Sequence, residues 1–167
     1  MNKLFKSLFF FIALFSLNAF GQNYKADIDS LRQQQKSMYE SSDFKLISKK
    51  IPLIPKDVTL EQLADTSKPT NEEKVELAKF QQFRSRIDER GNQISMIYMK
   101  PETYATALVA IRRDAQDKTE AALIELNAGK ITFGQFNKKR RDINEDMAAK
   151  QVQLGAEAKA AAASSSR

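Results

Sequence analysis

Residues 123–141, LIELNAGKITFGQFNKKRR, contain the pattern that decides the fold of this chain. A helical run of apolar residues ends at Gly129, where glycine permits the left-handed conformation that closes many helices. Thr132, followed three residues later by a glutamine, forms a capping box that begins a second helix. We therefore expect two long helices joined by a tight elbow, whose residues are Gly129, Ile131, Thr132 and Phe136.

Apolar residues spaced three and four apart predict long helices on both sides of this elbow. One helix is expected over residues 71–99, after a capping box at Thr70, and the next over residues 102–128. The last helix fades after residue 155 into an alanine- and serine-rich tail over residues 156–167. Because such a tail buries little apolar surface, we expect it to be disordered.

The segment before these long helices carries weaker helical patterns. A helix is expected over residues 26–42, with Asp27 as its N-cap, and a short helix over residues 59–64. Between them, residues 44–54 are densely apolar but contain a proline, which predicts a helical stretch and then an extended arm. We interpret the arm as a cover for the core of a helix bundle. Docking into the groove of a partner is the alternative.

Together these patterns predict an all-α fold, an elongated helical hairpin or small bundle of long helices, because no segment has the two-residue period of a strand. Residues 22–70 would supply the N-terminal helix and the apolar arm, and residues 71–155 the bundle. Glycine inside a helix costs about 1 kcal/mol relative to alanine, so the pair Arg90-Gly91 is expected to mark a kink or a break. The apolar faces are narrow, which favours coiled-coil-like packing or a small oligomer.

Residues 1–21 have the pattern of a signal peptide. Two lysines precede an apolar run over residues 8–17, and residues 19–21 (Ala-Phe-Gly) place small side chains where a signal peptidase reads them. We expect cleavage before Gln22 and a mature protein that is periplasmic or secreted. An uncleaved membrane anchor is the alternative, but the apolar run is shorter than the ~20 residues of a spanning helix.

The composition excludes several classes of site. The chain has 167 residues, with 27 Lys+Arg, 21 Asp+Glu, no cysteine and no histidine. Without cysteine and histidine, ordinary zinc, haem, copper and iron–sulfur sites cannot form, and neither can a Ser-His-Asp or Cys-His nucleophile. A glycine-rich phosphate loop and a dense Asp/Asn calcium loop are also missing from the sequence. We expect no catalytic residue, no metal and no cofactor, and therefore a protein that is not an enzyme.

Basic residues gather on both helices of the predicted hairpin. Arg112 and Arg113 precede the elbow, and Lys138, Lys139 and Arg141 follow it. The distances of the two groups from the elbow differ by about 6 Å of helix rise, so they are expected to form one basic face. Its ligands would be acidic proteins, lipid head groups or lipopolysaccharide phosphates, whereas the interleaved acids argue against nucleic acid. The competing interpretation is a solvated helix face whose charges are balanced by neighbouring acids.

The elbow pattern over residues 123–143 resembles the SHOCT short C-terminal helical domain, which pairs a helix, a Gly-x-Ile-Thr turn and a second helix opening with Glu-Glu-Phe. Here Gly134-Gln135 stands in place of the two glutamates. The resemblance implies a role in oligomerisation or interaction and no catalysis. Residues 58–62 and 131–135 also look like the L-T-x-x-Q repeats of periplasmic Spy and CpxP-type proteins, which are small, exported, helical chaperones or stress sensors.

These observations predict an exported, non-catalytic helical protein that binds other macromolecules of the cell envelope, as an adaptor or in a chaperone-like way. Its partners would be envelope proteins that contact its helix faces and are attracted by its charge. The alternative from another class is a structural, coiled-coil-like homo-oligomer. A third hypothesis is a protein that binds anionic lipid or lipopolysaccharide surfaces.

Overall fold

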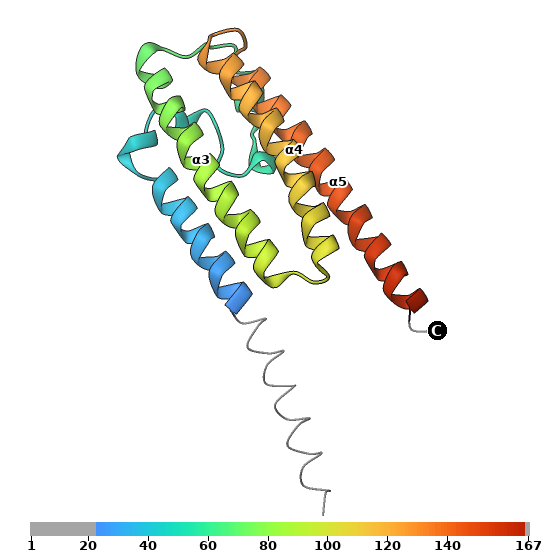
Figure 1. Cartoon of the computed structure of the whole chain (residues 1–167). Coiled ribbons are helices and arrows are strands. Elements are labelled where there is room, and N and C mark those ends of the chain that lie inside the picture. The colour runs from blue at the N-terminus through green and yellow to red at the C-terminus, as the bar shows by residue number, and fades with distance from the viewer. Residues whose placement is uncertain (1–22, 166–167) are drawn as a thin grey trace, which may run out of the picture.

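The computed structural model describes residues 23–165, and the predicted signal peptide with its cleavage site lies outside this range. Every regular element in this range is a helix or a helical turn, as the sequence predicts (Figure 1). None of these helices is both long and apolar enough to cross a membrane. After a helix over residues 23–39, the order is η1 (Ser42–Phe44), η2 (Ile47–Lys49), η3 (Pro55–Asp57), α2 (Leu60–Ala64), α3 (Asn71–Tyr98), α4 (Glu102–Asn127) and α5 (Phe133–Ser165).

The long helices form a small bundle. Helices α3, α4 and α5 lie side by side and alternate in direction, and the 23–39 helix lies beside α3 (Figure 1). The hydroxyl of Tyr98, at the end of α3, donates to Asp27 at 2.9 Å and ties these two helices together. The predicted all-α bundle is therefore confirmed, with the 23–39 helix as its fourth long member.

The connection between the 23–39 helix and α3 supplies much of the core. Phe44, Ile47 and Ile51 are fully buried in one cluster with Phe80 of α3 and Phe136 of α5. The segment therefore covers the core, as we interpreted it from the sequence. The predicted helical stretch that ends near Lys50 corresponds to the short turn η2, and residues 51–54 after it are not helical, with Ile54 in the extended region.

Threonine caps fix the starts of the helices that follow. The hydroxyls of Thr59 and Thr70 each accept from a backbone N–H three residues later, and the side chains of Gln62 and Glu73 complete both capping boxes. Helix α3 then continues without interruption past Gly91, so the predicted break does not occur. Packing against neighbouring helices outweighs the ~1 kcal/mol that glycine costs within a helix.

Two helix boundaries also differ from the sequence prediction. The first described helix covers residues 23–39, so Asp27 lies inside it and accepts from Tyr98 instead of capping the helix. At the other end of the chain, α5 remains helical to Ser165, where the sequence predicts a disordered tail from residue 156. The alanines of this tail favour helix even though they bury little.

Candidate functional site

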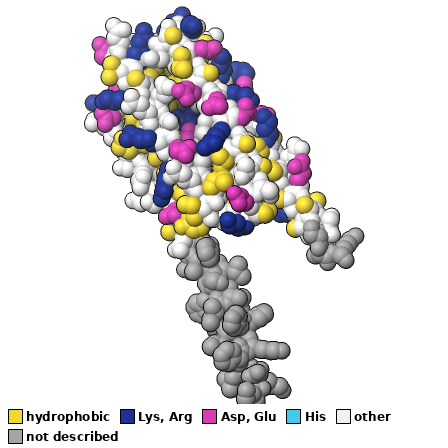
Figure 2. Space-filling view, viewed as in Figure 1, with side chains coloured by type: hydrophobic (Ala, Val, Ile, Leu, Met, Phe, Trp, Pro, Cys, Tyr) yellow, Lys and Arg dark blue, Asp and Glu magenta, His cyan; other side chains and the backbone are white. Residues whose placement is uncertain are grey.

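Four of the five residues of the predicted basic face are paired with carboxylates. Lys138 meets Asp142 at 2.7 Å, Lys139 meets Glu125 at 2.6 Å, Arg141 lies 3.6 Å from Asp142, and Arg113 lies 3.7 Å from Glu89. Figure 2 shows basic and acidic side chains interspersed on the visible surface. The structure therefore does not bring these residues together as one uncompensated patch, because acids on the same or the facing helix neutralise them.

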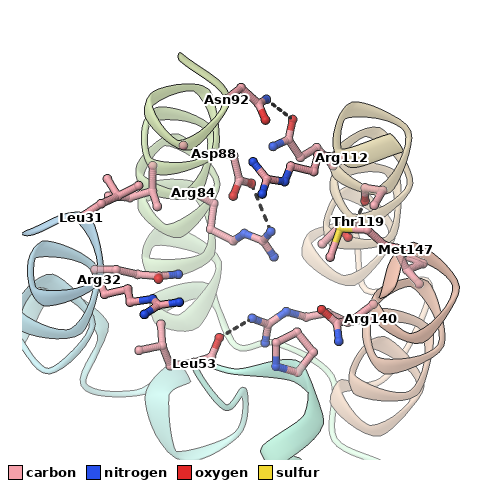
Figure 3. A pocket seen from close by; sticks show the side chains of 18 of the residues that line it. Leu31, Arg32, Leu53, Arg84, Asp88, Asn92, Arg112, Thr119, Arg140 and Met147 are labelled. Carbon is pink, nitrogen blue, oxygen red and sulfur yellow. Dashed lines mark hydrogen bonds and ion pairs between the residues drawn. The ribbon is translucent and has the colours of Figure 1, made fainter. Parts of the chain in front are cut away.

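Arg112, the fifth residue, contributes to a cavity inside the bundle. This cavity has a volume of about 370 Å³ and lies between the 23–39 helix, α3, α4, α5 and the segment around Leu53. Arg32, Arg84, Arg112 and Arg140 line it, each from a different helix, and Figure 3 shows their side chains around one space. We call this space the arginine cavity. Among its described lining residues Asp88 is the one carboxylate.

Polar contacts within the arginine cavity satisfy only part of its charge. Arg84 forms an ion pair with Asp88, one turn later on α3, at 3.1 Å. Arg112 donates to the hydroxyl of Ser95 at 2.6 Å, and the amide of Asn92 donates to Gln116 at 3.3 Å. A hydroxyl oxygen satisfies a donor but does not neutralise a guanidinium charge, so Arg112 remains an uncompensated cation among the described residues.

Arg140 is the most unusual member of the cavity. Its side chain donates to the backbone oxygens of Pro52 and Leu53, the latter at 2.7 Å, and the residue is 4% exposed. No carboxylate within residues 23–165 lies at ion-pair distance from it, and its Nε has no hydrogen-bond partner there. Burial lowers the pKa of Arg140 from 12.5 to about 9, and the neighbouring charge of Arg84 acts in the same direction. At neutral pH the group still carries its charge.

The elbow has the local geometry that the sequence predicts. Gly129 adopts φ 68°, which is the left-handed region. The hydroxyl of Thr132 accepts from the N–H of Gln135 at 3.2 Å, and the side chain of Gln135 accepts from the N–H of Thr132 at 2.9 Å. Ile131 packs against the core cluster, and Phe136 is fully buried within it. The elbow therefore holds α4 and α5 together and is part of the structural core.

Guanidinium and amide side chains make up most of the polar lining of the arginine cavity, and Asp88 is the one carboxylate among its described lining residues. Guanidinium and amide groups offer fixed hydrogen-bond donors, but none of them is a nucleophile or a proton acceptor at neutral pH. Within residues 23–165, no group of three or more His, Cys, Asp or Glu side chains is arranged to hold a metal ion. Guanidinium groups form charge-assisted hydrogen bonds, which are stronger than those between neutral groups.

The sequence patterns pointed to Arg112 but did not identify Arg140 as a member of the same site. Arg140 lies seven residues after Phe133 and seven before Met147, in a series that is otherwise apolar. A charged residue at such a core position is the signal that identifies it.

No family model, curated protein or solved structure matches this chain. The resemblance to the SHOCT domain accordingly stays a prediction, and the site is interpreted from its own geometry.

Proposed function

We propose that this chain is an exported, non-catalytic helical protein that binds other proteins of the cell envelope, as an adaptor or in a chaperone-like way. One observation carries the proposal: the last part of α5 lies outside the core of the bundle. Lys150 still reaches Asp114 of α4 at 3.5 Å, but none of residues 151–164 is buried. This stretch rises about 21 Å, long enough to contact a partner helix over several turns.

The chemistry of this stretch favours a protein partner over a lipid surface. Val152 is 75% exposed, and small alanines dominate the sequence that follows it. Small and aliphatic residues allow two helices to approach closely, which is how helical partners commonly dock. Glu157 and Lys159 balance each other, so the stretch offers no net positive charge to an anionic membrane. The ion pairs of the predicted basic face argue in the same direction.

The test is site-specific photo-crosslinking in cells that produce the protein, followed by mass spectrometry of the adducts. A crosslinker at position 152 is compared with one at position 139, whose lysine is held by Glu125. One dominant envelope protein captured from position 152 supports an adaptor, and a broad set of envelope proteins supports a chaperone-like role. Equal capture from both positions, or capture of other copies of this chain alone, overturns the proposal. The latter result supports the homo-oligomer instead.

Export is tested separately. Cell fractionation is expected to place the protein in the envelope or the medium, and sequencing of its N-terminus is expected to begin at Gln22. A cytosolic chain that still begins with residues 1–21 contradicts export. This measurement is independent of the crosslinking, so failure of one leaves the other interpretable.

A further inference from the structure

The arginine cavity has the size and shape of a small-molecule site. Its volume of about 370 Å³ lies within the range of pockets that enclose small organic ligands. Its walls come from four helices and from the segment around Leu53, which Arg140 holds by hydrogen bonds to two backbone oxygens. The cavity is therefore built from elements that lie far apart in the sequence.

The charge inside this cavity is strongly unbalanced. Of its four arginines, Arg84 is paired with Asp88, and Arg32 lies 3.6 Å from Asp29 on its own helix. Arg112 and Arg140 contact only neutral oxygens among residues 23–165. Arg140 is almost fully buried without a counterion, which is costly, and an anion bound beside it would lower that cost.

Part of the remaining lining is apolar. Ile28 and Leu31 from the 23–39 helix, Ile87 from α3, and Ile143 and Met147 from α5 line the same space. Inorganic phosphate or another small, fully hydrated anion would gain nothing from these side chains. A molecule with an anionic group and an apolar body would use both parts of the lining.

We propose that the arginine cavity binds a small organic anion, whose carboxylate or phosphate group is held by Arg112 and Arg140 and whose apolar body packs against the aliphatic walls. The two guanidinium groups come from helices α4 and α5, and both line the same cavity. Planar guanidinium groups bind both carboxylate and phosphate with paired hydrogen bonds. This site is independent of the protein-binding surface on α5 and goes beyond the function proposed above.

The test is calorimetric titration of the full chain, as isolated from cells, with octanoate and with octyl phosphate. 1-Octanol is titrated as a neutral probe and inorganic phosphate as a probe without an apolar body. We expect at least one of the two organic anions to bind, and both control probes to bind about tenfold more weakly or not at all. The stronger of the two anions identifies the preferred head group. Failure of both anions to bind overturns the proposal, and so does equal binding of 1-octanol or of inorganic phosphate.

The chain offers a matched pair of variants at adjacent positions. Arg112→Gln removes a charge from the cavity, whereas Arg113→Gln removes an exposed charge that faces Glu89 outside it. We expect Arg112→Gln to weaken binding of the organic anion about tenfold or more, and Arg113→Gln to leave it unchanged. Circular dichroism confirms that both variants remain helical. Equal affinities of the two variants overturn the assignment of Arg112.

A variant of Arg140 is unsuitable as the main probe, because loss of its hydrogen bonds to Pro52 and Leu53 is expected to disturb the fold. The second variant is therefore Arg112→Lys, which keeps the charge but loses the paired donors. We expect its affinity to lie between those of the wild type and Arg112→Gln. An affinity equal to that of Arg112→Gln overturns the role of charge at this position.

Discussion

Gly134, in the first turn of α5, lies so close to the backbone of Leu63 in α2 that a Cβ atom at position 134 would stand 2.4 Å from the Leu63 oxygen. The same Cβ would lie 2.7 Å from the oxygen of Asp65. The absence of a side chain lets the N–H of Gly134 donate to Asp65 O at 2.9 Å, while the N–H of Phe133 donates to Ser67 O at 3.0 Å. The start of α5 is thus hydrogen-bonded to the chain that leads into α3.

Replacing this glycine is expected to destabilise the protein. In Gly134→Ala the added methyl group meets backbone oxygens, which cannot move aside as a flexible side chain can. We expect the free energy of unfolding to fall by about 1–3 kcal/mol, the usual cost of overpacking. Urea denaturation of the variant and the wild type measures this difference.

Gly155→Ala is the control, because a Cβ atom at position 155 meets nothing within 4 Å. Alanine favours helix over glycine by up to about 1 kcal/mol, so this variant is expected to be as stable as the wild type or slightly more so. Equal effects of the two substitutions would contradict the close approach of α2 and α5.

Asn137 is expected to contribute strongly to stability through two hydrogen bonds. It is buried on α5, and its amide donates to Lys50 O at 2.8 Å and to Gln62 O at 3.1 Å. In Asn137→Ala both bonds are lost inside the protein, and we expect a loss of about 1–3 kcal/mol in the free energy of unfolding. The neighbouring substitution Lys138→Ala, which removes an exposed ion pair with Asp142, is expected to cost about 0.5 kcal/mol or less. Equal losses in the free energy of unfolding for Asn137→Ala and Lys138→Ala would refute this role of Asn137.

Helix starts were predictable because a cap is a local pattern. Thr70 and Thr132 each have their partner three residues later, so a short stretch of sequence contains the whole interaction. Gly129 was predictable for the same reason. Of the kink or break predicted at Gly91, the break does not occur, because local propensity is weak where neighbouring helices pack on both sides.

The arginine cavity was not predictable from local patterns. Arg84, Arg112 and Arg140 lie 28 residues apart on three helices, and only the rotation of each helix about its axis decides whether they meet. The pairing of the predicted basic face with acids also depends on how the helices are rotated. Lys138 pairs with Asp142 four residues later on its own helix, whereas Lys139 pairs with Glu125 on the facing helix.

The elbow makes a prediction about backbone conformation. Gly129 adopts φ 68°, where a Cβ atom is strained whatever the surrounding space. Gly129→Ala is therefore expected to lower the free energy of unfolding by about 1 kcal/mol. Asparagine tolerates the left-handed region better, so Gly129→Asn is expected to cost less than Gly129→Ala. Thermal unfolding of the two variants in parallel checks the order, and the reverse order would contradict the assigned conformation.

Tyr39 gives the stability of the protein a dependence on alkaline pH. Its hydroxyl is buried and has no hydrogen-bond partner among residues 23–165. Burial raises the pKa of Tyr39 from 10 to about 12, although the positive charge of Arg140 opposes the shift. Between these values the unfolded chain releases the proton and the folded chain keeps it, so the free energy of unfolding falls as the pH rises from about 10 to about 12.

Tyr39→Phe removes both the unpaired hydroxyl and this titration. Because no hydrogen bond of the phenol is lost, we expect the variant to be at least as stable as the wild type at pH 8. At pH 11 its advantage is expected to grow, since phenylalanine carries no proton to release. Urea denaturation of both proteins at the two pH values measures the change, with other titrating groups common to both. A constant difference between the two proteins from pH 8 to pH 11 would show that Tyr39 ionises equally readily in the folded and unfolded chains.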